Sequence, residues 1–162
     1  MCGMRVHLGA DHAAFDAKNY LAESLRAAGH EVVDHGPFRY DADDDYPTFC
    51  FRAAEAVAGD QGSLGVVLGG SGNGEQIVAN KVRSIRAALA WNEDTARLAR
   101  EHNDANVLAI GARQHEPAQV VAFVEVFLAT CYSNEARHTR RIGMISRYEE
   151  TGEVPPLPGP AR

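Results

Sequence analysis

The chain has 162 residues, of which 45% are hydrophobic, and a formal net charge of −6. This length allows one domain with a sizeable core, the acidic balance argues against general affinity for nucleic acid or an anionic membrane, and no apolar run approaches the ~20 residues of a membrane span. Cys2, Cys50 and Cys131 show no disulfide-framework spacing and no secretory pattern precedes the first apolar run, so we expect idle or buried thiols and a cytoplasmic location.

Apolar and amphipathic segments alternate along the chain. The predicted strands cover residues 5–9, 31–35, 64–68, 86–90 and 106–110. The predicted helices cover residues 13–28, 46–58, a segment ending near 82, 93–102, 117–129 and 134–151, and Pro47 and Pro117 are well placed to begin two of them.

This alternation predicts βαβ units and an α/β fold. We expect a three-layer, doubly wound (Rossmann-like) parallel sheet of five strands, in the order 2-1-3-4-5, with helices on both faces and a C-terminal helix. Residues 1–151 are predicted to form a single domain. Residues 152–162 contain four prolines and two glycines and are predicted to be a flexible tail.

A glycine-rich loop follows the third predicted strand. Four glycines lie within residues 69–74, where a strand is predicted to end and a helix to begin. Such a loop aims backbone N–H groups into one space, and the helix N-terminus adds partial positive charge, so the loop suits an anion or a developing oxyanion. Glu75 stands at its rim, which suggests proton abstraction next to a carbonyl. A plain tight connection is about equally expected from the loop alone.

The loop does not fit a nucleotide-binding motif. No G-x-G-x-x-G can be placed, and Glu75-Gln76 stands where a P-loop has Lys followed by Ser or Thr. Glu75 has a simpler interpretation as a first-turn glutamate that favours the helix dipole. The same dipole would keep the carboxylate ionised and make it a weaker base.

Asp11 and His12 follow the first predicted strand. In the predicted order, the first and third strands are neighbours at the switch point, where ligands collect at the carboxyl ends. These two side chains should therefore share a crevice with the glycine loop. The alternative is that Asp11 caps the next helix and that His12 lies at the surface.

A basic cluster, Arg137-His138-Thr139-Arg140-Arg141, lies in the last predicted helix. Arg137 and Arg141 share a face, and two guanidinium groups on one face suit phosphate recognition, although a solvated basic face is the default. Arg113 could join them, and the cluster could reach a neighbour's crevice in a symmetric dimer. His102, at a predicted helix C-terminus, is either a surface histidine or an acid/base group.

No metal is expected. Asp41, Asp43, Asp44 and Asp45 resemble a metal loop, but Tyr46 and Arg52 occupy the positions where an EF-hand needs Gly and Glu. We therefore expect a solvated acidic loop. The seven histidines show no metal-ligand spacing.

Together these segments resemble the type B family of ribose-5-phosphate isomerases, within the wider group that includes galactose-6-phosphate and allose-6-phosphate isomerases. The likeness spans roughly residues 5–148. Its motifs are Gly9-Ala10-Asp11-His12-Ala13, Tyr46-Pro47, Gly70-Ser71-Gly72-Asn73-Gly74, Ala79-Asn80-Lys81, His102-Asn103-Asp104-Ala105-Asn106, Gly111-Ala112-Arg113 and Arg137-His138-Thr139-Arg140-Arg141-Ile142.

The resemblance implies an isomerase of the non-oxidative pentose phosphate pathway that needs no cofactor or metal and interconverts ribose 5-phosphate and ribulose 5-phosphate through a cis-enediolate. It implies a homodimer with shared sites, or a dimer of dimers. The implied catalytic residues are Glu75, His102, Ser71 and Asp11. The implied substrate-binding residues are Asp11, His12, Tyr46, Gly70, Ser71, Gly72, Asn73, Gly74, Asn103, Arg113, Arg137, His138 and Arg141.

One departure concerns the base. Many members carry a catalytic cysteine where this chain has Gly69, and a mainly actinobacterial subgroup uses a glutamate at the position of Glu75. This chain resembles that subgroup. The alternatives are an isomerase of a six-carbon phosphosugar, such as allose 6-phosphate or galactose 6-phosphate, and a non-catalytic phosphosugar-binding domain, which would need neither Glu75 nor His102.

Overall fold

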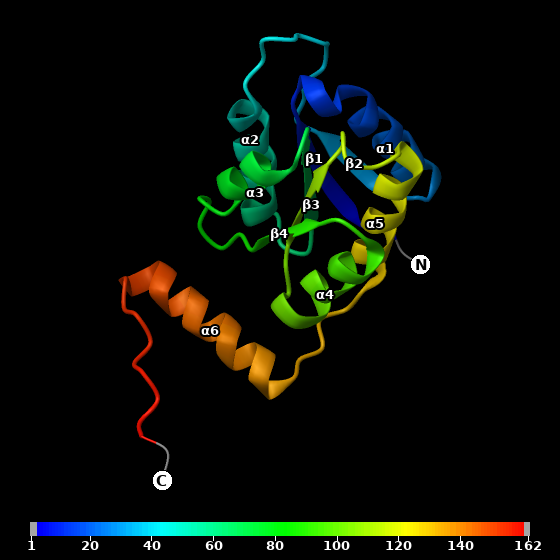
Figure 1. Cartoon of the computed structure of the whole chain (residues 1–162). Coiled ribbons are helices and arrows are strands. Elements are labelled where there is room, and N and C mark those ends of the chain that lie inside the picture. The colour runs from blue at the N-terminus through cyan, green and yellow to red at the C-terminus, as the bar shows by residue number, and fades with distance from the viewer. Residues whose placement is uncertain (1–2, 161–162) are drawn as a thin grey trace.

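A single parallel sheet organises the computed structural model, which describes residues 3–160 (Figure 1). Cys2, whose thiol was expected to be idle, lies outside these residues. The sheet has the order β2-β1-β3-β5-β4. Its strands are β1 (Arg5–Ala10), β2 (Glu31–Asp34), β3 (Leu64–Gly69), β4 (Ala87–Ala90) and β5 (Val107–Gly111).

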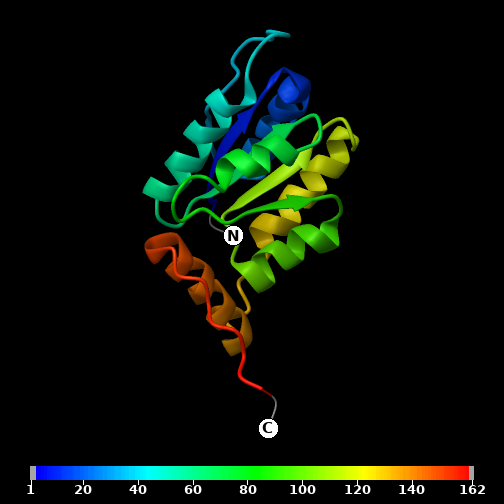
Figure 2. The ribbon, with the colours of Figure 1, turned by 60° about the vertical axis from the view of Figure 1, so that its left-hand side comes forward.

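Helices cover both faces of the sheet (Figures 1 and 2). They are the 3-10 helix η1 (His12–Ala14), α1 (Phe15–Ala27), α2 (Tyr46–Gly59), α3 (Asn73–Ala79), α4 (Glu93–Asn103), α5 (Pro117–Ala129) and α6 (Ala136–Thr151). Helix α5 packs between α1 and α4 on one face, and α2 packs beside α3 on the other. The predicted three-layer, doubly wound architecture with a C-terminal helix is confirmed.

Element boundaries match the sequence-based expectations closely, with three local differences. The first helix begins as the 3-10 turn η1, α3 ends at Ala79 rather than near 82, and α6 begins at Ala136. Residues 152–160 follow α6 without a helix or strand, and the flexibility of this tail remains a prediction. Within residues 3–160, no helix combines the length and apolarity that crossing a bilayer would require.

The predicted order of the last two strands was wrong. β5, not β4, pairs with β3, and β4 forms the edge by pairing with β5. Burial explains the exchange. The residues of β5 are fully buried, whereas β4 is a short run of three alanines and one leucine that is only partly buried. The strand with larger apolar side chains therefore takes the interior, and the short one takes the edge.

Two hydrophobic cores lie on the two faces of the sheet. Val66 and Leu68 of β3 belong to the core under α1, α4 and α5, whereas Val67 belongs to the core under α2 and α3. This alternation follows from the two-residue period of a strand. The switch point between β1 and β3 is unaffected by the exchange of β4 and β5, so the predicted crevice is preserved.

A buried lysine anchors the loop between β2 and α2. Lys18 of α1 is fully buried, and its ammonium donates to Asp34 Oδ2 at 2.6 Å and to the carbonyl oxygen of Pro37 at 2.9 Å. The other carboxylate oxygen of Asp34 accepts from the backbone N–H of Gly36 at 2.8 Å. These contacts tie the end of β2 and the start of the loop to α1.

We expect Lys18→Met to lower the free energy of unfolding by about 3 kcal/mol, because it leaves the Asp34 carboxylate without its cationic partner. Urea denaturation measures the change, and Lys81→Met, which alters an exposed lysine, is the control. The double variant Lys18→Met/Asp34→Asn should recover part of the loss. A loss equal to that of the control would show that the buried pair contributes nothing.

Candidate active site

The glycine-rich loop leads from the buried end of β3 into α3. Gly72 has a φ of +81°, and a Cβ there would lie 2.7 Å from Leu89 Cδ1 and 2.9 Å from the backbone nitrogen of Gly111. Glycine is therefore required for both conformation and space. The backbone N–H of Ala112 donates to the Gly69 carbonyl at 2.7 Å, and that of Arg113 donates to the Gly70 carbonyl at 3.2 Å. These bonds hold the end of β5 against the loop.

Glu75 lies in the first turn of α3 and is 4% exposed. Its side chain folds back over the end of β3, and a Cβ added at Gly69 would overlap its carboxylate. The missing side chain at residue 69 thus provides the space that Glu75 occupies. A cysteine at 69 and this position of the Glu75 carboxylate are mutually exclusive.

Burial raises the pKa of Glu75 above the ordinary glutamate value, and the negative charge of Asp11 raises it further. Bonds to the backbone N–H groups of Glu75 and Gly72 lower the pKa but do not outweigh burial. The N–H groups at the start of α3 thus act in the direction expected of the helix dipole, but their effect is smaller than that of burial. Burial in the crevice makes it a stronger base.

Gly69→Ala should displace this carboxylate. We expect kcat to fall about a hundredfold, the loss typical of misplacing a reacting group by about an ångström, together with a lower melting temperature. Initial rates and thermal unfolding measure the two effects. In Gly69→Ala/Glu75→Ala the clash is gone, so the double variant should be more stable than the sum of the single changes predicts. Additive losses would contradict the steric coupling.

Asp11 and the glycine loop share one crevice, as the switch-point argument predicts. Asp11 is buried, and its charge acts on the pKa values of both Glu75 and His12. Its Oδ1 also accepts from the Ala13 backbone N–H at 3.0 Å and so caps η1. The capping interpretation is therefore confirmed as well, and capping and proximity to Glu75 coexist.

His12 forms an ion pair that the sequence did not indicate. Its Nδ1 lies 2.7 Å from Asp44 Oδ1. The acidic loop was expected to be solvated, but the Asp44 side chain is only 8% exposed and turns inward. Among residues 3–160, one group of three His, Cys, Asp or Glu side chains has potential metal-ligating atoms within 4.8 Å of one another. It consists of Asp11, His12 and Asp44. Because His12 already bonds Asp44, we interpret the group as an ion pair with a neighbouring cap.

Tyr46 and Arg113 complete the crevice from two further elements. A Cβ on Gly74 would lie 2.6 Å from Tyr46 Cζ, so the phenol packs directly over the loop. A Cβ on Gly70 would lie 3.5 Å from Arg113 Nη1. Ser71 is exposed at the loop tip, and its Oγ accepts from the Asn73 backbone N–H at 3.3 Å.

The two cysteines within residues 3–160, Cys50 and Cys131, are not part of this site chemistry. Cys50 of α2 is buried, and the pKa of its thiol is raised by burial and by the charges of Glu75 and Asp11, so it carries little thiolate. Cys131 is exposed and unpaired.

A second cluster lies at the opposite end of the strands, near their amino ends. Helix α4 begins after the carboxyl end of β4 and runs back, so His102 and Asn103 at its end lie near the amino end of β5. Helix α6 begins nearby, because the Ser133 backbone N–H donates to the Glu101 carbonyl at 3.1 Å. One chain therefore does not bring His102, Arg137 or Arg141 to Glu75.

His138 differs from the arginines beside it. It is buried, its ring centroid lies 4.3 Å from that of His102, and its Nδ1 lies 3.0 Å from Ser133 Oγ. Arg137, Arg140 and Arg141 are exposed. His138 thus joins α6 to the end of α4 rather than sharing the exposed basic face.

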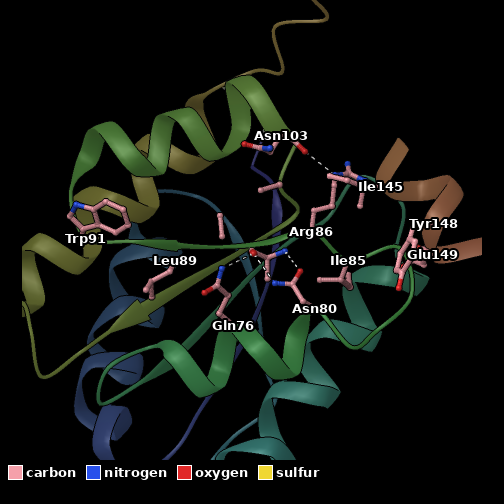
Figure 3. A pocket seen from close by; sticks show the side chains of 13 residues that line it. Gln76, Asn80, Ile85, Arg86, Leu89, Trp91, Asn103, Ile145, Tyr148 and Glu149 are labelled. Atoms are coloured by element: carbon pink, nitrogen blue, oxygen red, sulfur yellow. Dashed lines mark hydrogen bonds between the residues drawn. The ribbon is translucent and has the colours of Figure 1, made fainter. Parts of the chain in front are cut away.

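Helix α6 stands away from the sheet (Figure 2), and a cavity of about 790 Å³ with both apolar and polar lining residues lies between it, α3 and β4 (Figure 3). Its lining includes Gln76, Asn80, Leu89, Trp91, Ile145 and Tyr148. Trp91, Ile145 and Tyr148 are each more than half exposed. This surface is distinct from the crevice around Glu75, and it presents large apolar side chains to solvent.

The chain is similar in sequence to known isomerases. The sequence profile of a family described as Ribose/Galactose Isomerase matches residues 6–145. The chain is 56% identical over 159 residues to "Ribose-5-phosphate isomerase B" of Mycobacterium tuberculosis, covering 98% of each chain. It is 53% identical over 159 residues to the protein of the same name from Mycobacterium leprae, again covering 98% of each.

Solved structures agree with this likeness. Ribose-5-phosphate isomerase B from Mycoplasma genitalium, with bound ribulose-5-phosphate, is 36% identical and superposes with a TM-score of 0.88 over 93% of this chain and 99% of that one. The enzyme of the same name from Clostridium thermocellum is 37% identical, with a TM-score of 0.87 over 93% and 100% of the two chains.

Proposed function

The chain belongs to the ribose/galactose isomerase family, and from that membership we propose how its residues interconvert D-ribose 5-phosphate and D-ribulose 5-phosphate. The observation that carries the proposal is the buried carboxylate of Glu75 in the space above Gly69. The reaction moves a proton between C2 and C1 of the open-chain sugar. Glu75 removes the proton from C2 and returns it to C1, and its raised pKa makes it a stronger base than an ordinary glutamate.

The glycine loop stabilises the negative charge that develops. When the C2 proton leaves, the electron pair moves toward the C1 carbonyl oxygen and forms a cis-enediolate. The proton of the C2 hydroxyl then passes to the C1 oxygen, so that protonation at C1 leaves a hydroxymethyl group at C1 and a carbonyl at C2. In this proposal, the Ser71 hydroxyl and backbone N–H groups of residues 70–74 donate to the enediolate oxygens, except the N–H groups of Gly72 and Asn73, which already bond the Glu75 carboxylate and Ser71 Oγ. The loss of one such donor typically costs about 3 to 4 kcal/mol of transition-state stabilisation.

A second copy of the chain completes the site in this proposal. The carboxyl ends of the strands carry Glu75, Asp11 and Arg113. The opposite, amino ends carry His102, Arg137 and Arg141, called the amino-edge cluster. The exposed apolar side chains of α6, with Trp91 just after β4, supply a surface that a homodimer would bury. In the dimer, the amino-edge cluster of one copy faces the crevice of the other.

The shared site divides the remaining roles. His102 of the second copy protonates the ring oxygen of the cyclic aldose, while Asp11 accepts the proton of the C1 hydroxyl. Arg113, together with Arg137 and Arg141 of the second copy, holds the phosphate, and His12, Tyr46 and Asn103 also contact the substrate. His138 positions His102 through the contact between their rings. No step in this scheme calls for a metal or a cofactor, and the unpaired cysteines suit a cytoplasmic enzyme.

Initial rates of ketose formation from ribose 5-phosphate test the function, with allose 6-phosphate and galactose 6-phosphate in parallel and EDTA present throughout. We expect turnover of ribose 5-phosphate to exceed that of both six-carbon sugars. Preference for a six-carbon sugar would make the chain a hexose-phosphate isomerase. Binding without turnover of any of the three would make it a binding domain.

A further inference from the structure

Asp44 is the one aspartate of the acidic loop that is withdrawn from water. Asp41, Asp43 and Asp45 are exposed, whereas the Asp44 side chain is 8% exposed. Its Oδ1 accepts from His12 twice, from the backbone N–H at 2.9 Å and from Nδ1 at 2.7 Å. Its Oδ2 is buried and has no hydrogen-bond partner within residues 3–160. A carboxylate in such surroundings needs a cationic partner.

His12 is surrounded by charges on three elements. Asp44 comes from the loop before α2, Asp11 from the end of β1, and Arg113 from the segment after β5, while the Tyr40 ring meets the imidazole edge-on. The hydrogen bond to Asp44 raises the pKa of His12, the charges of Asp11 and Asp44 add to this, and partial burial and Arg113 oppose it. In the described part of the chain, no protein group bonds Nε2, so that nitrogen is free for a ligand.

The loop that carries Asp44 is anchored at its start and closes a turn at Asp44. Lys18 holds Asp34 and Pro37 at its start, and the Ala10 backbone N–H donates to the Gly36 carbonyl at 3.0 Å. Next to His12, the Asp44 backbone N–H donates to the Asp41 carbonyl at 3.2 Å and closes a turn. The Asp44 carboxylate is therefore held in place before any ligand binds.

We propose that Asp44 positions His12 and holds it protonated, so that the His12 imidazolium and Arg113 together receive the phosphate of the substrate. This proposal rests on the function proposed above and adds Asp44 to it as a positioning residue. The position of Arg113 beside Gly70 puts its guanidinium and the His12 ring at the same end of the glycine loop. Two adjacent cations match a phosphate dianion rather than a neutral hydroxyl.

Asp44→Asn tests the proposal because the amide keeps the shape and the acceptor oxygen but loses the charge. At pH 6, below the ordinary histidine pKa, we expect nearly equal KM values for ribose 5-phosphate. At pH 8 we expect the KM of the variant to be about tenfold higher, the loss typical of one charge-assisted hydrogen bond, with kcat within about twofold of wild type. The ratio of variant to wild type at each pH cancels the titration of the substrate itself.

Asp43→Asn is the matched control, because it removes the same charge from the same loop at an exposed residue that does not contact His12. It should leave both KM and kcat unchanged at pH 6 and pH 8. A KM ratio for Asp44→Asn that is the same at both pH values, or a loss confined to kcat, would overturn the proposal.

NMR titration of His12 gives a measurement that depends neither on turnover nor on the folding of the variant. In the wild-type protein, His12 should titrate above pH 6.5, and inorganic phosphate should shift its ring resonances. Titration at or below pH 6.5 overturns the proposal, as does the lack of any shift with phosphate. If ribose 5-phosphate is not isomerised, the proposed function fails, and the NMR result still decides whether His12 is held protonated and meets phosphate.

Discussion

Replacement of Glu75 by glutamine is expected to lower kcat for ribose 5-phosphate about a thousandfold, within the range that a positioned general base contributes. Glutamine fills the same space above Gly69 and keeps a polar group there, but its amide cannot accept the C2 proton. Substrate binding should survive, because the phosphate and hydroxyl contacts are unchanged. Coupled initial-rate assays measure kcat, and isothermal titration with ribose 5-phosphate measures binding to the inactive variant.

Glu93→Gln is the matched control for this variant. Glu93 is also a first-turn helical glutamate, but it is exposed at the start of α4. If Glu75 served only the helix dipole, the two variants would behave alike, and both would lose a few tenths of a kcal/mol of stability. Wild-type turnover by Glu75→Gln would remove Glu75 from the mechanism and favour a binding domain.

The pH dependence of the Glu75 variant has a definite sign. Because burial raises the pKa of Glu75 in the folded state, the wild-type protein loses stability as the pH rises from the ordinary glutamate value through the raised one. Glutamine does not titrate, so Glu75→Gln should be more stable than wild type above this window and no more stable below it. Denaturation at several pH values tests this, and log kcat/KM of the wild-type enzyme should fall toward acid through the same raised pKa.

The sequence predicted the crevice because its determinants are local. Gly72 and the loop around it indicate a turn whatever the rest of the fold. The pairing of β1 with β3 is then enough to bring Asp11 to that loop. The order of β4 and β5 is not local, since it depends on which strand is buried from both sides. The larger side chains of residues 107–110, compared with the alanines of β4, were the available signal.

Charged residues were the harder part. A run of aspartates is ordinarily solvated, and only the folded loop, anchored by Lys18, shows that Asp44 turns toward His12. The net shift of the Glu75 pKa was missed for the same reason, because the helix dipole follows from the sequence but burial beneath neighbouring elements does not. The separation of His102 from Glu75 follows from the topology alone, since α4 must run back across the sheet.

Activity should return when two inactive variants are combined, if the active site is shared between subunits. Glu75→Gln lacks the base at the carboxyl edge of the sheet, and His102→Asn lacks the ring-opening group at the amino edge. In a dimer that contains one copy of each, one site combines both defects and the other combines intact Glu75 with intact His102. Random pairing of equal amounts makes half of the dimers mixed, so the mixture should recover about a quarter of wild-type activity.

The experiment requires exchange of subunits, which joint unfolding and refolding of the two variants provides. Glu75→Gln refolded with the double variant Glu75→Gln/His102→Asn is the matched control, because no pairing of these chains contains an intact Glu75. If each chain formed a complete site by itself, the mixture of single variants would stay as inactive as this control. Recovery of activity only in the mixture of single variants would require that His102 of one copy act on the sugar whose proton Glu75 of the other removes. The separation of the two clusters across the sheet would then be what makes the dimer the smallest active unit.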